Sequence, residues 1–456
     1  MSDAPAGARS RALSIAAVAL LAAATVSAPW RGHVDDTDAQ LYQVVVRNMV
    51  RSQDWMNLSY LPGVHAAFRE HLPFGLWPFA LAATFGGERT LPVVAALFTL
   101  GALGVTCWLG ERRGPRGTGL AAALLLAVTE SFFAYGGRPR LDPLLVLLST
   151  WSAAIILVDH RGAGRWLAAA VIAAGAALVK GPFGLVPLVA ASLALAVATR
   201  SLRPLLSGAA AATAAAIPVA VFLLWDRAHG QSWWNGYWRG QLLASATAER
   251  MDGSTAWWFP FASIAGRFWP GFVLLAFAAV RTARGRPEAV PYLLWALFTL
   301  VLLCIPGRKV WNHQLIAFPA LALAGAASIA PWAANRRAPL VLGALAAVTL
   351  GAAGAGAGRL LLRPPCVVSV ELAPALDRLR PGEEILVISS PVSWRTVAEL
   401  AAERDLSVWI AEGWDSLPAA QHAGTAMVQE DLAAPSSAPE GWRQAGSGRG
   451  WVLMTR

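Results

Sequence analysis

Residues 12–49 read "ALSIAAVALLAAATVSAPWRGHVDDTDAQLYQVVVRNM" and join an apolar run to a cluster of acids. The run over 12–30 is close to the roughly 20 residues that a membrane-spanning helix needs. Three carboxylates, Asp35, Asp36 and Asp38, follow it within four positions. Such a cluster is either a solvated loop just past a span or chemistry held at the membrane surface.

The first apolar run also has features of a signal peptide. Arg9 and Arg11 precede it, and small residues around 26–28 resemble a cleavage site. Because many more apolar runs follow, we predict a retained anchor.

The composition indicates a polytopic membrane protein. Of 456 residues, 56% are hydrophobic and only 14% are charged, whereas soluble domains carry about a quarter charged residues. The net charge of +10 comes mostly from short Arg clusters between apolar runs. This is typical of cytoplasmic loops, so nucleic acid is not an expected partner. The three cysteines show neither a disulfide framework nor metal spacing.

The apolar runs predict about eleven transmembrane helices, an all-α polytopic fold. They lie at 12–30, 90–110, 118–136, 141–158, 166–179, 183–199, 204–225, 268–280, 289–306, 314–332 and 338–358. Compact Arg-rich loops alternate with the other loops, which places the N-terminus inside and, for an odd number of spans, the C-terminus outside.

The loops on the predicted outer side are different in kind. Those at 31–89 and 226–267 are long, and most of them mix acids, bases and aromatics. Residues 38–52 have the apolar spacing of an amphipathic helix, which either lies on the membrane surface or packs as an ordinary loop helix.

Residues 366–456 regain soluble character and predict a small α/β domain after a transmembrane domain over 1–360. Strands are expected at 384–389, 406–412, 425–430 and 451–456, and a helix at 395–405. This extracytoplasmic domain contains no Gly-rich phosphate loop, and its sequence indicates no chemistry.

Acidic and basic side chains gather on the predicted outer face. An ionisable residue at the end of a span is a functional candidate, although snorkelling and helix capping account for many such cases. The candidates are Asp38, Glu70, His71, Asp142, Lys180, Arg308 and Lys309.

Five segments give the chain a resemblance to a known family. They are "DAQLYQVVVRNM" (38–49), "REHLPFGLW" (69–77), "RLDP" (140–143), "KGP" (180–182) and "RKVWNHQLIAFPALAL" (308–323). With these segments in this order, the chain resembles the GT-C glycosyltransferases over about residues 10–330. It is most similar to the group of bacterial lipid A aminoarabinose transferases and protein O-mannosyltransferases. It departs from the lipid A transferases at His71, where they have Lys, and at Leu72, where a second Pro is usual.

The resemblance implies an inverting glycosyltransferase of the bacterial inner membrane with its site facing the periplasm. The donor would be a polyprenyl-phosphate sugar, and the acceptor a lipid, glycan or protein of the cell envelope. Aligned on Tyr42, a substrate-binding candidate, Asp38 matches the family's catalytic Asp. Asp142 matches its second carboxylate, and Glu70 matches its Glu.

The chemistry of transfer gives these residue types roles. Inversion needs a base for the acceptor proton, and Asp38 is the candidate. The leaving lipid phosphate needs cations, which Lys180, Arg308 and Lys309 could supply, with His71 as a further phosphate ligand. No metal ligand is assigned, although Asp38 and Asp142 could share a divalent cation.

Two other classes of protein remain open. A transporter or flippase for a lipid-linked sugar would also have many spans and outer charges, but such proteins more often carry ionisable residues in mid-span. A structural or assembly protein with a binding domain at its C-terminus would not need the one-sided pattern of acids and cations.

Overall fold

The structure is a computed structural model that describes residues 36–61, 66–249, 253–268, 271–285, 287–333, 372–389, 394–411, 414, 423–430, 438–448 and 450–456. These residues form two compact units. The helical unit comprises 69–75 and 92–333, and the mixed unit comprises 36–68, 76–91 and 372–456. Each is described by itself.

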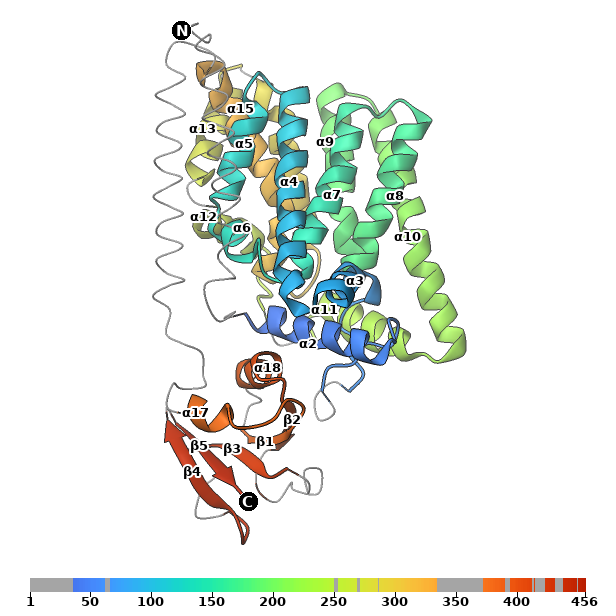
Figure 1. Ribbon diagram of the computed structural model, residues 1–456. Helices are drawn as coiled ribbons and strands as arrows, with labels where there is room; N and C mark the ends of the chain where they lie inside the picture. The colour runs from blue at the N-terminus through green and yellow to red at the C-terminus, as the bar shows by residue number, and fades with distance from the viewer. Residues whose placement is uncertain are drawn as a thin grey trace, which may run out of the picture. The chain divides into compact units, whose positions relative to one another are not determined.

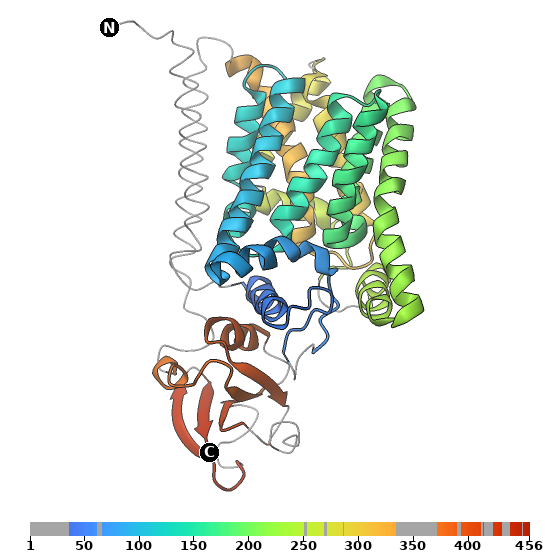
Figure 2. The same ribbon diagram turned by 45° about the vertical axis from the view of Figure 1, so that its right-hand side comes forward.

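The helical unit is a bundle of long apolar helices, which lie side by side in Figures 1 and 2. In it α7 packs against α8 and α9, α10 packs against the same two helices, and α15 packs against α5, α13 and α14. The helices are α4 (Leu91–Arg113), α5 (Thr118–Ala127), α6 (Glu130–Tyr135), α7 (Leu141–Val158), α8 (Ala163–Lys180), α9 (Val186–Thr199), α10 (Arg203–His229), α11 (Ala244–Ala246), α12 (Phe259–Arg267), α13 (Gly271–Ala283), α14 (Val290–Cys304) and α15 (Phe318–Ala333).

Six helical stretches of the described chain are long and apolar enough to cross a membrane, or seven if the bent pair α12 and α13 is one span. One of the six, Ala163–Thr199, joins α8 and α9, which the sequence predicts as two spans. The predicted runs at 12–30 and 338–358 lie outside the described residues. The count of eleven therefore stays a prediction.

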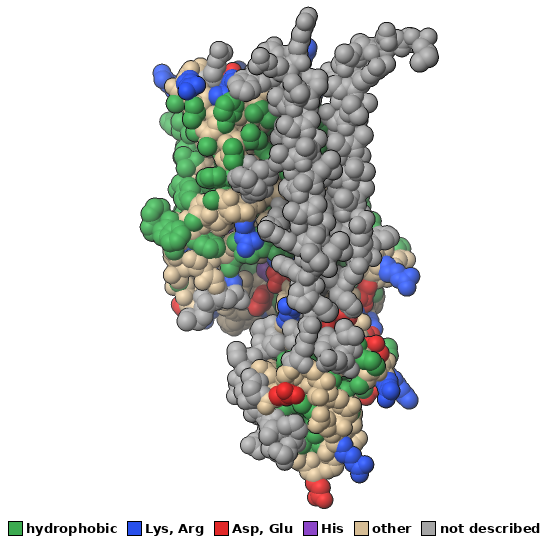
Figure 3. All heavy atoms as spheres, turned by 90° about the vertical axis from the view of Figure 1, so that its left-hand side faces the viewer, with side chains coloured by type: hydrophobic (Ala, Val, Ile, Leu, Met, Phe, Trp, Pro, Cys, Tyr) green, Lys and Arg blue, Asp and Glu red, His purple; other side chains and the backbone are tan. Residues whose placement is uncertain are grey.

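The outer surface of the helical unit is apolar. On α10, for example, Ile217, Val221 and Leu224 are each more than half exposed. Figure 3 shows hydrophobic side chains gathered over one face of this unit, with Lys and Arg side chains at its end. Exposed apolar helix faces between charged ends are the pattern of lipid contact, so the chain is a multi-pass membrane protein.

The mixed unit contains a five-stranded sheet of order β2-β1-β3-β5-β4. Strands β1 (Glu384–Ile388), β2 (Ser407–Ala411) and β3 (Thr425–Gln429) are parallel. Strands β4 (Arg443–Gly448) and β5 (Trp451–Thr455) complete it in antiparallel fashion. Helix α18 (Trp394–Glu403) is the crossover that a parallel β1–β2 pair requires; a short helix α17 (Ala373–Leu376) precedes β1.

The amphipathic segment after the first apolar run forms α2 (Thr37–Ser52). It packs against α18 and against α3 (Trp77–Gly86), and Val44, Val45 and Met49 are buried. The structure therefore favours a packed loop helix over a helix that lies on the membrane surface.

Arg47 of α2 joins this helix to the C-terminal part of the mixed unit. Its side chain is 8% exposed. Nη1 donates to the carbonyl of Ala401 (2.9 Å) and to Asp405 Oδ1 (2.7 Å). Nη2 donates to the carbonyl of Ala402 (3.0 Å) and to Glu88 Oε2 (2.8 Å), and Nε donates to the other Glu88 oxygen. All five N–H groups of the guanidinium are thus used.

The acceptors explain why this arginine is tolerated inside the unit. Ala401 and Ala402 lie in the last turn of α18, where carbonyls lack partners within the helix. Asp405 also accepts from Arg51 Nη2 at 2.6 Å. Partial burial alone would raise the pKa of the Asp405 carboxyl, but the hydrogen bond from Arg51 and the charges of both arginines hold that pKa below its usual value.

Candidate functional site

Asp142 lies between two cations at the start of α7. Its side chain is 2% exposed. Oδ1 accepts from Lys180 Nζ at 2.7 Å, and Oδ2 accepts from Arg140 Nε at 3.0 Å. Both cations are themselves buried. The three groups carry one more positive than negative charge.

Local sequence explains where these side chains stand. Asp142 lies in the first turn of α7, where a carboxylate is favoured by the helix dipole. Pro143 follows there at no cost, because the first amides of a helix have no partner in it. Lys180 ends α8, so packing of the start of α7 on the end of α8 closes the pair. Arg140 was not among the predicted site residues, although "RLDP" places it two positions before Asp142.

The turn after Lys180 depends on a glycine. Gly181 begins a 3-10 segment, Gly181–Leu185, that joins α8 to α9. Its φ is +59° with ψ −138°, a region that essentially only glycine occupies. A Cβ here would also overlap with the hydroxyl of Tyr237.

We expect Gly181→Ala to lower the free energy of unfolding by at least about 1–3 kcal/mol, the cost of forcing an ordinary residue into such a conformation. The midpoint of thermal unfolding in detergent would show it. Gly164→Ala is the control: Gly164 lies in the first turn of α8, and an added Cβ meets no atom within 4 Å. That variant should be neutral or slightly more stable; equal effects of the two would contradict the expectation.

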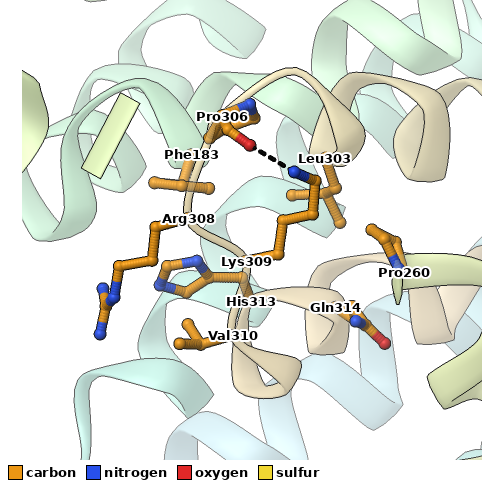
Figure 4. Close-up of a pocket in the computed structure, with 9 residues that line it drawn as sticks. All are labelled: Phe183, Pro260, Leu303, Pro306, Arg308, Lys309, Val310, His313 and Gln314. Atoms are coloured by element: carbon orange, nitrogen blue, oxygen red, sulfur yellow. Dashed lines mark hydrogen bonds between the residues drawn. The ribbon is translucent and has the colours of Figure 1, made fainter. Parts of the chain in front are cut away.

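A pocket of about 210 Å³, including its open mouth, lies between this turn and the loop after α14 (Figure 4). It is lined by Phe183, Pro260, Leu303, Pro306, Arg308, Lys309, Val310, His313 and Gln314.

The two predicted cations of this loop behave differently. The ammonium of Lys309 is bound by three carbonyls, those of Pro306 (2.7 Å), Gly307 (3.2 Å) and Thr255 (3.4 Å). It therefore stabilises the loop. In Figure 4 the guanidinium of Arg308 points away from that ammonium.

Aromatic contacts link the ion cluster to the pocket segment. The rings of Tyr135 and Trp311 stack at 5.1 Å between centroids. The Arg140 guanidinium lies 4.4 Å from the Tyr135 centroid, and that of Arg267 lies 3.9 Å from the Trp311 centroid. Such cation–π contacts favour fixed side-chain positions. His313 of the same segment contacts the pocket residue Phe183, with 4.2 Å between the centroids of the two rings.

Glu70 and His71 lie in the segment 69–75 of the same unit and are half-buried. Gly75, at the end of this segment, packs so closely that a Cβ would lie 3.1 Å from Leu141 and 3.3 Å from the Cα of Val179. These are the chain neighbours of Asp142 and Lys180. The structure thus brings the segment of Glu70 and His71, the Asp142 cluster and the 308–313 segment together in the helical unit.

Asp38 and Tyr42 belong to the mixed unit, on α2. Asp36, one of the three clustered acids, is the N-cap of this helix: its Oδ1 accepts from the amide of Ala39 at 3.2 Å. Asp38 lies in the first turn and is half-buried, and Tyr42 is buried. The cluster therefore contains one structural acid, and Asp35 lies outside the described residues.

The residues around Asp142 do not fit a divalent cation. Among the described residues, no three His, Cys, Asp or Glu side chains are grouped as metal ligands. Both carboxylate oxygens of Asp142 are already paired with cations, which would repel a metal ion. A divalent cation bound at Asp142 is therefore not expected.

Comparisons with known proteins agree with this architecture. No family model and no curated protein matches the chain. A crystal structure of ArnT from Cupriavidus metallidurans bound to undecaprenyl phosphate is similar, with a TM-score of 0.71 at 16% identity over 97% of each chain. The apo state of that protein gives 0.72 at 16% identity, over 99% of this chain and 98% of that one.

A third structure is more distant. The Archaeoglobus fulgidus oligosaccharyltransferase in complex with Zn and sulfate has a TM-score of 0.55 at 14% identity, over 91% of this chain and 68% of that one. At such low identity the likeness concerns the fold. The bacterial and the archaeal enzyme are both of the GT-C type, and the chain described here has the GT-C fold.

Proposed function

We propose that this protein is an inverting glycosyltransferase that moves a sugar from a polyprenyl-phosphate donor to a cell-envelope acceptor at the outer leaflet of the bacterial inner membrane. The observation that carries the proposal is the buried Arg140–Asp142–Lys180 cluster. It places two buried cations on one carboxylate and adjoins, through the Gly181–Leu185 turn, a pocket lined by Arg308 and His313. A lipid-linked phosphate is the anion that such a site in a membrane protein would bind. The similar ArnT structure, which holds undecaprenyl phosphate, supports this choice.

The cations act on the leaving group. When the bond between the anomeric carbon and the phosphate oxygen breaks, the electron pair stays on that oxygen. Fixed positive charges aimed at it lower the barrier, because they need not reorganise during the reaction. Asp142 holds Lys180 and Arg140 in place, and Arg308 lines the adjoining pocket.

Asp38 is the proposed general base. It takes the proton of the acceptor hydroxyl while the hydroxyl oxygen attacks the anomeric carbon from the side opposite the phosphate, which inverts the centre. Asp142 is less suited to this role, because both of its oxygens already accept hydrogen bonds from cations. Glu70, His71 and Tyr42 remain candidates for substrate binding.

The distribution of ionisable residues favours this enzyme over a flippase. Asp142 is the second residue of α7 and Lys180 is the last of α8, so both stand at span ends. Transporters of lipid-linked substrates more often have such groups near the bilayer midplane.

The test is transfer by the purified protein from radiolabelled polyprenyl-phosphate sugars to membrane extracts. We expect Asp38→Asn to lower the rate about 10²- to 10⁴-fold, the usual contribution of a general base. Asp36→Asn is the matched control, because Asn caps a helix as well as Asp does and should keep the wild-type rate. Equal rates for wild type and Asp38→Asn would remove Asp38 from this role. Label that crosses the bilayer without any new covalent linkage would instead identify a flippase.

A further inference from the structure

The hydroxyl of Tyr237 is a buried polar group that the proposed chemistry does not use. The side chain is 1% exposed. Its Oη has no hydrogen-bond partner in the described part of the chain. Buried hydroxyls nearly always have such a partner, and one without it destabilises the fold. A phenylalanine would fill the same space without that cost.

The backbone around Tyr237 is also unusual. Residues Trp234–Leu243 form a π-helix of ten residues. This conformation is rare, occurs mostly as single turns and is often found at functional sites. Asp226 fixes its start: Oδ2 accepts from the amide of Trp234 at 2.7 Å.

The hydroxyl lies against the turn that joins the ion cluster to the pocket. Its oxygen occupies the place where a Cβ of Gly181 would stand. Lys180, which binds Asp142, precedes that glycine, and Phe183, which lines the pocket, is two residues beyond it. The neighbour that covers the hydroxyl therefore has no side chain.

We propose that Tyr237 is a substrate-binding residue whose hydroxyl donates a hydrogen bond to an oxygen of the polyprenyl-phosphate sugar. This inference rests on the proposed function. The oxygen packs on Gly181 in the structure, and ligand binding would have to shift the 180–183 turn for the oxygen to meet the ligand. The oxygen that accepts this hydrogen bond belongs either to the phosphoryl group or to a hydroxyl of the sugar. The two cases differ in which lipid, with or without its sugar, binds more weakly once the Tyr237 hydroxyl is removed.

The test compares two matched substitutions. Tyr237→Phe removes the hydroxyl alone. Tyr292→Phe is the control, because Tyr292 is 2% exposed and its Oη also lacks a hydrogen-bond partner among the described residues. Leu303 of the pocket lies eleven positions further along α14, which is about 16 Å at 1.5 Å per residue. Both variants should unfold at the wild-type temperature or above it, because each loses an unsatisfied polar group.

Only Tyr237→Phe should impair the enzyme. We expect kcat/KM for transfer to fall about 10- to 100-fold, the range for a hydrogen bond to a charged or polar substrate group, whereas Tyr292→Phe stays within twofold of wild type. An unchanged kcat/KM in Tyr237→Phe would overturn the proposal. So would a lower unfolding temperature in that variant, since it would show that the hydroxyl has a structural partner.

Binding measurements locate the acceptor oxygen and separate this inference from the proposed function. If Tyr237→Phe weakens binding of polyprenyl phosphate itself, the hydroxyl meets the phosphate; if it weakens only binding of the sugar-loaded lipid, the hydroxyl meets the sugar. Either result supports the inference even if the substrate that receives the sugar is not identified. Equal binding of both lipids by wild type and variant would overturn it, whereas a wild type that binds the lipids but transfers nothing would count against the proposed function alone.

Discussion

Asp142→Asn is expected to abolish transfer and to destabilise the helical unit by about 3–5 kcal/mol. Removing one member of a buried ion pair leaves an uncompensated charge inside the protein. Here Lys180 and Arg140 both lose a carboxylate that accepts from them, and both are themselves buried. Thermal unfolding in detergent and transfer from a polyprenyl-phosphate sugar would measure the two effects.

A second substitution tests whether Asp142 and Lys180 stabilise the protein as a pair. In Asp142→Asn with Lys180→Met, only Arg140 remains charged, so the double variant should be less destabilised than the sum of the single ones. A coupling of about 0.5–3 kcal/mol is typical of residues in one network. Simple additivity would show that the ion pair does not govern the stability of this end of α7.

An exposed ion pair just after the end of α7 offers a control. Asp159 follows α7 and pairs with Arg165 at 3.9 Å, but its side chain is 43% exposed. Exposed pairs contribute about 0–1 kcal/mol. Asp159→Asn should therefore leave both stability and transfer close to wild type, and a large effect there would mean that any loss of charge near α7 is harmful.

The spacing of apolar residues predicted where helices and strands form more successfully than it predicted which elements pack or pair with one another. The strands at 384–389, 406–412, 425–430 and 451–456 are confirmed within a residue or two, and most of their apolar side chains are buried. Strand β4 was missed, since "RQAGSG" has no apolar alternation and forms the exposed edge of the sheet. Its pairing with β5 comes from backbone hydrogen bonds, which do not depend on an apolar side-chain pattern.

The candidate site shows the same limit. A carboxylate at the start of a predicted span identified Asp142, but nothing in the spacing indicates that Lys180, 38 positions away, binds it. Lys309 has the charge for a phosphate site, yet its ammonium is engaged by carbonyls that only the folded loop brings together. The sequence does not set Tyr237 apart from the other aromatics of the 226–267 loop, whereas its burial against Gly181 does.

The amphipathic pattern of α2 likewise does not reveal what covers its apolar face. In the structure α18 and α3 do so, and Arg47, a charged residue within the same segment, donates hydrogen bonds from all five of its N–H groups. A charge in an amphipathic pattern is normally read as solvated. Here the uncapped carbonyls at the end of α18 and the carboxylates of Glu88 and Asp405 provide the partners.

Arg47→Ala is accordingly expected to cost the mixed unit about 3–5 kcal/mol. The change leaves Glu88 without its cation, removes one of the two arginines that pair with Asp405, and leaves two carbonyls of α18 without a donor. Because α2 also carries Asp38, transfer should fall along with stability. Limited proteolysis of the C-terminal part, together with the midpoint of thermal unfolding, would report the loss.

Arg51→Ala is the matched comparison, because Arg51 lies one turn further along α2 and donates to the same carboxylate of Asp405, at 2.6 Å. Its side chain is 59% exposed, so the expected cost is at most about 1 kcal/mol. Arg47→Lys should lie between the two, since an ammonium has three donors where the guanidinium uses five. If Arg47→Ala were no more harmful than Arg51→Ala, the lost ion pair with Asp405 would account for the whole cost in stability. The contacts to Glu88 and to the end of α18 would then contribute nothing to holding α2 in place.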